Sequence, residues 1–436
     1  MVKPVESCPP IKRKIVPKKN WHKEYNLPDE YEHEGYLDEQ IVSKMRNNLQ
    51  LSSYCSANCI FCCNKMGPLE TLVLPFRSID SIKRGLDFID GDYSDKIGLR
   101  LFRRLSEGES ILHPKLFEIL GLIREKFPEH EIQLETNGST LKPNILKELS
   151  RFKPLTICLS YHSHNPENWS KITGLPKELH ENPKRAFLNA KLLGLTIEPT
   201  LSPVPNLTGY SDIENTIAFI SKFNNEMEMT LPCYTKELPE ELKSTLHSDF
   251  FDLVDFAERM EKKYSIKINC DPDTRKPIVF YPRHVIQKTI KSGHKNVVWM
   301  MSECAYARAK VVLDSEKKTN NHFVKLVKNT VYGGNCITSG LLQVEDFRLA
   351  LREMISLLGF TPELVLLPSV CFDLKGNDLC GEHYSVLESE FSTKIWIIAD
   401  QRDYDVYRID GSLSSQEKLE LQTYLKYQDS EKTNEC

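Results

Sequence analysis

The chain has 436 residues, and 57 Lys and Arg against 61 Asp and Glu give it a formal net charge of −4 at pH 7. This length is enough for two or three domains, or for one large barrel with an extension. The slightly acidic balance argues against a surface that grips nucleic acid regardless of sequence. A composition that is 40% hydrophobic and 27% charged, with no apolar stretch long enough to span a bilayer, predicts a soluble protein and excludes a membrane protein.

Residues 1–46 are predicted to form a basic, proline-rich arm. Six Lys or Arg and four Pro fall within the first twenty positions, and no apolar core with a small-residue cleavage site follows. This pattern is not a secretory signal, so we expect a cytoplasmic location. Because cytoplasmic thiols stay reduced, clustered members of the 13 cysteines indicate a metal site rather than disulfides.

Between residues 47 and 270, short apolar runs alternate with helical patterns. The predicted strands are residues 49–54, 98–103, 131–134, 155–160, 196–201 and 228–231, with a further strand-like run at 265–269. The predicted helices are residues 78–89, 114–126, 142–151, 183–193, 212–223 and 250–263. Such alternation predicts an α/β fold in which crossover helices join parallel strands.

The pattern changes after about residue 291. Strands are predicted at residues 297–301, 310–313, 363–367 and 394–399, with one clear helix at 344–358. We expect a separate C-terminal α+β domain over residues 271–412, followed by a charged tail at 413–436.

Three cysteines follow the first predicted strand at the spacing C-x3-C-x2-C, namely Cys55, Cys59 and Cys62. In a loop, this spacing lets three thiolates point at one centre. Structural zinc is the alternative, but it takes four ligands, and the adjacent Cys63 would struggle to reach the same ion as Cys62. Three ligands with one position left open suit chemistry better than a structural site.

This run, with Phe61 before the last cysteine, resembles the signature of the radical S-adenosylmethionine (SAM) superfamily. The resemblance implies that the three thiolates bind a [4Fe-4S] cluster whose free iron chelates the amino and carboxylate groups of SAM. It further implies that an electron from the cluster cleaves the sulfonium, giving a 5′-deoxyadenosyl radical that abstracts hydrogen from a substrate. The implied fold over residues 47–270 is a partial (β/α)6 TIM-like barrel, the radical SAM core.

Later segments resemble the SAM-binding segments of the same superfamily. Gly108 and Glu109 match the core of a Gly-Gly-Glu-Pro segment, in which Glu107 here replaces the first Gly and Ser110 the Pro. Residues 135–138 read Glu-Thr-Asn-Gly, residues 160–163 read Ser-Tyr-His-Ser, and segments 165–167 and 172–174 are also similar. The SAM-binding residues implied by the resemblance are Phe61, Gly108, Glu109, Asn137, Ser160 and Asn206.

Two of these segments also have a purely structural interpretation. Taken singly, Glu109 could be a helix-capping carboxylate, and Asn137 with Gly138 could form a turn.

The segment 331–342, with the helix and strand that follow, resembles a domain of unknown function that ends one group of radical SAM proteins. It carries no activity to transfer. A second, auxiliary cluster stays open, because folding can gather scattered cysteines. The scattered cysteines that could contribute are Cys233, Cys270, Cys304, Cys336, Cys371 and Cys380.

The sequence therefore predicts a radical SAM enzyme acting on a small metabolite, in a biosynthetic or rearrangement reaction. Its implied partner is a low-potential electron donor of the ferredoxin or flavodoxin type. The enzymatic alternative is modification of a protein or an RNA, with the basic arm as a tether. The alternative of another class is a non-catalytic module whose cysteines hold structural zinc.

Overall fold

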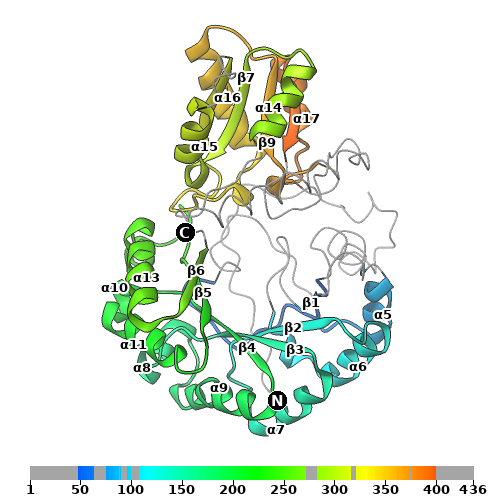
Figure 1. Ribbon diagram of the computed structural model, residues 1–436, viewed down its shortest axis with the longest axis vertical. Helices are drawn as coiled ribbons and strands as arrows, with labels where there is room; N and C mark the ends of the chain where they lie inside the picture. Colours follow the sequence, from blue (N-terminus) through cyan, green and yellow to red (C-terminus); the bar gives the residue numbers. More distant parts are fainter. Residues whose placement is uncertain are drawn as a thin grey trace, which may run out of the picture. The chain divides into compact units, whose positions relative to one another are not determined.

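The computed structural model describes residues 48–62, 75–87, 89, 96–99, 108–271, 282–315, 321–372 and 376–398. The predicted arm and tail, together with Cys63 and Glu107, lie outside these residues. The chain divides into two compact units, residues 1–273 and 274–436 (Figure 1).

The first unit is built on a six-stranded parallel sheet whose strands lie side by side in chain order. They are β1 (Lys96–Leu99), β2 (Glu131–Thr136), β3 (Leu155–Ser160), β4 (Thr196–Leu201), β5 (Glu226–Thr230) and β6 (Lys267–Asp271). Because parallel neighbours need crossover connections, helices run between successive strands. The α/β prediction is confirmed, and the curved sheet with helices along its outer side is that of a partial barrel (Figure 1).

The helices of this unit differ in length, and not all of them were predicted from the sequence. They are α5 (Ile79–Asp87), α6 (Leu116–Lys126), α7 (Pro143–Leu149), α8 (Pro166–Thr173), α9 (Glu181–Leu193), α10 (Pro205–Thr208), α11 (Tyr210–Ile220), α12 (Glu240–Leu246) and α13 (Phe250–Tyr264). The short helix α8 was not predicted. Asn165 caps it, because its side chain accepts hydrogen bonds from two backbone N–H groups of the first turn.

Alternate residues of each strand face opposite sides of the sheet. In β4, Ile197 and Leu201 are buried against the helices, whereas Thr196 and Glu198 are exposed. Along β4, β5 and β6 the sheet therefore has an apolar, helix-covered face and a polar face, whereas β3 is buried on both sides except at Ser160.

The predicted strand at residues 49–54 is wrong among the described residues. Asn48 makes only an isolated parallel bridge with Gly98, and the Leu49 N–H donates to the Gly98 carbonyl at 2.7 Å. Leu49 and Leu51 are nevertheless fully buried. Burial produced the apolar pattern, and the chain leaves the sheet at once to form the cysteine loop, defined as residues 55–62.

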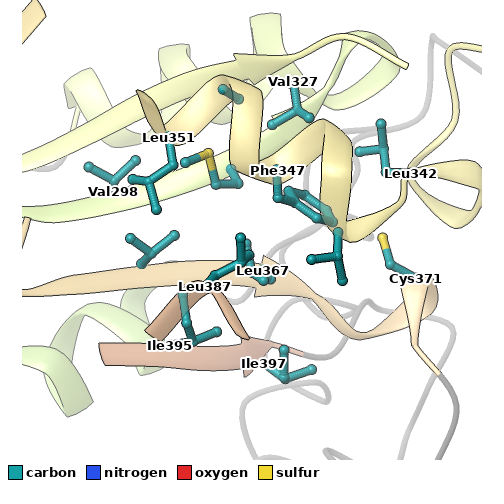
Figure 2. Packing of buried hydrophobic residues seen from close by; sticks show 14 of the residues in the cluster. Val298, Val327, Leu342, Phe347, Leu351, Leu367, Cys371, Leu387, Ile395 and Ile397 are labelled. Carbon is teal, nitrogen blue, oxygen red and sulfur yellow. The ribbon is translucent and has the colours of Figure 1, made fainter. Parts of the chain in front are cut away.

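The second unit has a four-stranded parallel sheet in the order β10-β9-β7-β8. The strands are β7 (Val297–Ser302), β8 (His322–Val327), β9 (Leu364–Pro368) and β10 (Lys394–Ile398). Helices α14 (Pro282–Lys291) and α15 (Glu303–Ser315) cover one face, and α16 (Val344–Leu358) and α17 (Ser385–Phe391) cover the other. On the latter face Phe347 and Leu351 of α16 pack against Val298 and Leu367 (Figure 2).

This unit is α/β rather than the predicted α+β. The apolar run at residues 310–313 lies inside α15 and is not a strand. The strand β8 was missed because five of its six residues are only half-buried, so they show no clear alternation. Without β8 and the unpredicted helices, the alternation of strand and helix could not be recognised.

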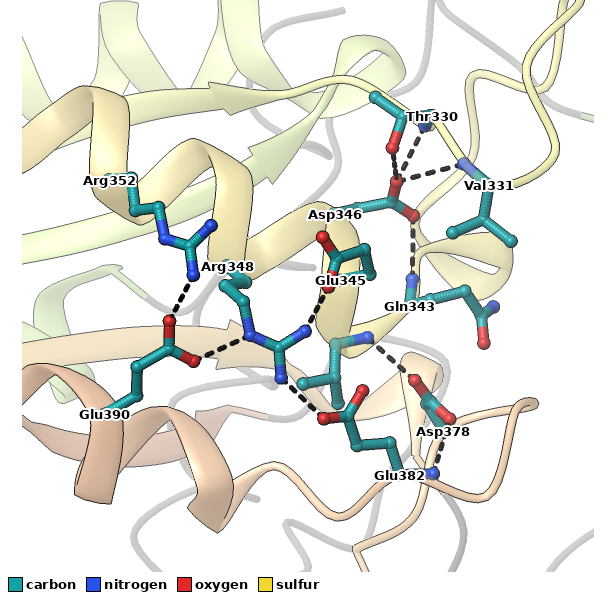
Figure 3. A network of polar contacts seen from close by, with 11 residues as sticks. Thr330, Val331, Gln343, Glu345, Asp346, Arg348, Arg352, Asp378, Glu382 and Glu390 are labelled. Atoms are coloured by element: carbon teal, nitrogen blue, oxygen red, sulfur yellow. Dashed lines mark hydrogen bonds and ion pairs between the residues drawn. The ribbon is translucent and has the colours of Figure 1, made fainter. Parts of the chain in front are cut away.

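Buried acidic side chains fasten the loops at the carboxyl end of this second sheet (Figure 3). Asp346 of α16 accepts from the N–H groups of Thr330 at 2.7 Å, Val331 at 3.2 Å and Gln343 at 2.9 Å. The Thr330 hydroxyl donates to the same carboxylate at 2.6 Å. One aspartate thus closes the capping box of α16 and orders the loop after β8.

None of the described helices is both long enough and apolar enough to cross a membrane.

Candidate active site

The cysteine loop begins where the chain leaves the edge of the first sheet beside β1. Cys55, Cys59 and Cys62 are half-buried and form no disulfide. The Cys62 N–H donates to the Cys59 carbonyl at 3.2 Å, which turns the end of the loop back on itself.

The C-terminal end of α8 holds the middle of the loop. The Asn58 N–H donates to the Thr173 carbonyl at 2.7 Å, and the Ile60 N–H donates to the Ile172 carbonyl at 3.0 Å. Gly174 ends α8 with a φ of 68°, and a Cβ there would lie 3.0 Å from the Asn58 side chain and 3.2 Å from its carbonyl oxygen. Both conformation and space favour glycine here. The segment 172–174 noted in the sequence therefore supports the cysteine loop.

Apolar contacts hold the first half of the loop. Ala57 forms a buried cluster with Trp169 and Leu175, and Cys55 and Cys59 pack against it. These two thiols therefore have an apolar surface on one side.

Phe61 holds the second half of the loop. With Ile60 it packs against the buried residues Val204, Leu238 and Leu246. Its ring also meets the edge of the His162 ring at a centroid distance of 4.9 Å.

His162 is a site residue that the sequence analysis missed. Its Nδ1 accepts a hydrogen bond from the Ser202 N–H at 3.1 Å, so the ring proton is on Nε2. Burial lowers the pKa of His162 to about 4, which leaves the imidazole neutral at neutral pH. His162 thus connects Phe61 of the cysteine loop to the backbone that follows β4. Its position directly after β3 was the available signal.

Glu109 lies at the centre of a buried polar network and is only 3% exposed. Its Oε2 accepts from Ser56 Oγ at 2.8 Å and from Asn137 Nδ2 at 2.7 Å, and its Oε1 accepts from Thr136 Oγ1 at 2.5 Å. Burial raises the pKa of Glu109, and the hydrogen bonds from Thr136 and Ser56 oppose that shift. Both carboxylate oxygens are engaged, so the side chain fastens the cysteine loop to the end of β2.

The neighbouring Gly108 has no room for a side chain. A Cβ there would lie 2.0 Å from the carbonyl oxygen of Ser52. This close approach of two backbones is the physical reason for glycine at the predicted position.

Asn137 serves both the turn and the network. Its Oδ1 accepts from the Ser139 N–H at 2.9 Å, which makes the turn that the structural interpretation predicted. Its Nδ2 also lies 2.9 Å from Ser56 Oγ and 3.9 Å from the sulfur of Cys55. Asn137 is therefore the residue that joins the end of β2 to the first cysteine.

Two of the predicted SAM-binding residues, Ser160 and Asn206, are not part of the network around the cysteine loop. Ser160 ends β3 half-buried, and its hydroxyl makes no hydrogen bond to any residue that the structure describes. Asn206 is exposed and donates to the carbonyls of Ser244 at 3.0 Å and His247 at 2.7 Å. Its amide hydrogens hold the end of α12, which leaves only its amide oxygen available to a ligand.

The donor set of the cysteine loop fits an iron–sulfur cluster. Three soft thiol donors lie on one loop and none is used in a disulfide. Within the described ranges, no group of three or more His, Cys, Asp or Glu side chains is arranged to hold one metal ion. A cubane cluster makes a different demand, because each thiolate binds its own iron.

Residues 49–220 match the family model described as the radical SAM superfamily. This span contains the cysteine loop, Glu109, Asn137 and the first four strands of the sheet. The chain therefore carries a radical SAM domain over these residues, which are less than half of its length. A domain of this family marks the protein as an enzyme and implies a [4Fe-4S] cluster and SAM as cofactors. A comparison with curated proteins finds no match.

Several solved structures resemble the chain. SuiB from Streptococcus suis, bound to S-adenosylmethionine, is 17% identical over 52% of this chain and 50% of its own, with a TM-score of 0.36. Native anSMEcpe with bound AdoMet is 15% identical over 56% and 66%, with a TM-score of 0.37. HydG, a maturase of the [FeFe]-hydrogenase, is 10% identical over 67% and 59%, with a TM-score of 0.39. The chain thus spans between half and two thirds of these proteins, and at such TM-scores they add nothing to the family match.

Proposed function

We propose that this protein cleaves SAM reductively at a cluster held by Cys55, Cys59 and Cys62, and uses the resulting radical to abstract hydrogen from a small polar metabolite. The cluster, when bound, supplies the electron for that cleavage. A low-potential donor of the ferredoxin or flavodoxin type would reduce it. The observation that carries the proposal is the fastening of the cysteine loop by three separate parts of the domain.

Each of these parts has a distinct physical task. The end of α8 fixes the backbone of the loop through two hydrogen bonds. Glu109 fixes Ser56, next to the first cysteine, by a hydrogen bond of 2.8 Å from the Ser56 hydroxyl to the buried Glu109 carboxyl group. Phe61, packed on His162, fixes the residue before the last cysteine. Because the loop is already held in place, binding a cofactor to these thiols requires little rearrangement of the protein.

The polar face of the sheet supports a polar substrate. Ser160 of β3 is in register with Thr200 of β4, Thr200 with Glu228 of β5, and Glu228 with Asn269 of β6. All four are half-buried or exposed, while their sequence neighbours Leu201, Met229 and Ile268 are buried. A row of hydroxyl, carboxylate and amide groups recognises hydrogen-bonding substrates rather than apolar ones.

The test is anaerobic reconstitution with iron and sulfide, followed by dithionite and SAM. We expect about four irons per chain and release of 5′-deoxyadenosine, measured by liquid chromatography and mass spectrometry. Cys59→Ala should lose both, whereas Cys233→Ala, a half-buried cysteine outside the loop, should keep both. A colourless protein that binds zinc, or full iron loading in Cys59→Ala, would contradict the proposal.

The substrate class needs a separate measurement. Small-molecule extracts, total RNA and protein fractions are added in turn to the reconstituted enzyme. We expect the small-molecule fraction to accelerate 5′-deoxyadenosine release. Acceleration by RNA or protein alone would replace the metabolite with a macromolecular substrate.

A further inference from the structure

Trp169 carries a buried hydrogen-bond donor without an acceptor. The side chain is fully buried, and its Nε1 has no hydrogen-bond partner among the residues that the structure describes. Within the described part of the chain, buried side-chain atoms that likewise have no hydrogen-bond partner are oxygens, among them Thr140 Oγ1, Asp212 Oδ2, Ser248 Oγ and Ser369 Oγ. The indole N–H is the sole polar group of tryptophan and can only donate. Trp169 is therefore buried with its whole hydrogen-bonding capacity unused, which is unfavourable.

The surroundings of this indole include the cysteine loop on one side and the His180 ring, whose centroid lies 5.6 Å from that of the indole. Trp169 belongs to the buried cluster against which Cys55 and Cys59 pack. Its helix α8 is tied to the loop by the hydrogen bonds from Asn58 and Ile60. The indole cannot move away from the two cysteines without breaking this connection.

Elsewhere the same chain provides a partner for a buried indole. Trp299 of the second unit is also fully buried, and its Nε1 donates to His322 Nδ1 at 3.0 Å. The unpaired indole of Trp169 is thus specific to its place beside the predicted cluster ligands.

We propose that the acceptor for the Trp169 N–H is a sulfur of the iron–sulfur cluster, either a cysteine thiolate or an inorganic sulfide. This inference depends on the proposed function, because it needs the cluster. A hydrogen bond to a cluster sulfur stabilises the extra negative charge of the reduced state and so raises the reduction potential. Trp169 is then a positioning residue that also tunes the potential at which the cluster accepts its electron.

The first test is the reduction potential of Trp169→Phe, which keeps an aromatic ring and removes the N–H. A redox titration followed by electron paramagnetic resonance should show a shift to more negative potential at unchanged iron content. Trp299→Phe is the matched control and should leave the potential unchanged. An unchanged potential in iron-loaded Trp169→Phe would overturn the inference.

The second test measures the unaltered protein, and the variants serve only to assign its signal. The chain is labelled with 15N at the indole nitrogen of tryptophan, and the reduced cluster is measured by pulsed electron paramagnetic resonance. We expect a 15N coupling that Trp169→Phe abolishes and Trp299→Phe retains.

The outcomes separate this inference from the proposed function. If iron binds and 5′-deoxyadenosine forms without any 15N coupling, the cluster does not accept the indole N–H and only the inference about Trp169 fails. If no iron binds, both fail.

Discussion

Replacing Glu109 is the sharpest test of how the cysteine loop is held. Its carboxylate accepts hydrogen bonds from Ser56, Thr136 and Asn137. In Glu109→Ala, Ser56 keeps a contact with Ser139 Oγ at 3.1 Å, but the Thr136 hydroxyl and the Asn137 amide lose a buried acceptor. Each of these two donors costs about 1–3 kcal/mol when it is left buried without an acceptor. Removing the carboxyl group also removes the cost of burying it, so we expect the unfolding free energy to fall by about 3 kcal/mol.

Glu109→Gln should cost less. Glutamine has the same shape and keeps one acceptor oxygen, and the Thr136 hydroxyl can rotate to accept from the new amide. We expect a loss of about 1 kcal/mol. Comparing the loss of unfolding free energy in the two variants separates the contribution of the hydrogen bonds from that of the side-chain volume.

The assay is the rate at which iodoacetamide alkylates the cysteines of the cluster-free, reduced protein, resolved by mass spectrometry. If the cysteine loop is about 3 kcal/mol easier to open, the fraction of molecules with an open loop rises up to about 100-fold. Cys55 and Cys59 should then react up to about 100-fold faster in Glu109→Ala. Cys371, which is 1% exposed, is the internal reference. Glu125→Ala, an exposed position on α6, is the matched control. Wild-type alkylation rates in Glu109→Ala would refute the reasoning.

Three further predictions concern other contacts. The pKa of His162 is about 4 in the folded protein against an ordinary 6.5. Between pH 6.5 and pH 4, His162 is therefore protonated in the unfolded chain but neutral in the folded protein. Stability should therefore drop by about 3 kcal/mol from pH 6.5 to 4 through this residue, and His162→Asn should lose that share of the pH dependence in urea unfolding; an identical pH profile would count against the assignment. Gly174→Ala should destabilise by about 1–2 kcal/mol because of its positive φ, while Gly121→Ala, with open space around it inside α6, should stabilise by up to about 1 kcal/mol; equal effects in thermal unfolding would contradict this. In the second unit, Asp346→Ala should cost about 3 kcal/mol, because it strands several buried donors, and exposed Arg352→Ala less than about 1 kcal/mol; similar costs in urea unfolding would disprove the difference.

Much of the first unit could be predicted because its strands are bounded apolar runs of ordinary length. The predicted strands at 155–160 and 196–201 coincide with β3 and β4, and in the second unit the predicted helix at 344–358 coincides with α16. The run at 310–313 was misassigned because its β-branched valines favour strands locally, whereas the surrounding sequence forms one continuous helix. Local preference loses to tertiary context at such places.

The site was predictable only where its pattern is local. The spacing of Cys55, Cys59 and Cys62 is a property of eight consecutive residues and needs no tertiary information. Ser56 and Glu109 are 53 positions apart in the chain, so no local sequence pattern predicts their contact. The support from α8 and the packing of Phe61 on His162 are of the same kind. Sequence patterns thus identified the chemistry, and the structure identified the fastening.

The described partners of the cysteine loop follow it in the chain. Glu109, Asn137, His162 and Thr173 come later in the sequence, and Leu246, which packs against Phe61, comes last. During synthesis the amino-terminal part of a protein emerges first, so the three thiols leave the ribosome well before anything that can hold them. They stay accessible to oxidants and to iron–sulfur delivery proteins until α8 has formed. A cell must therefore keep these thiols reduced at least until α8 has folded.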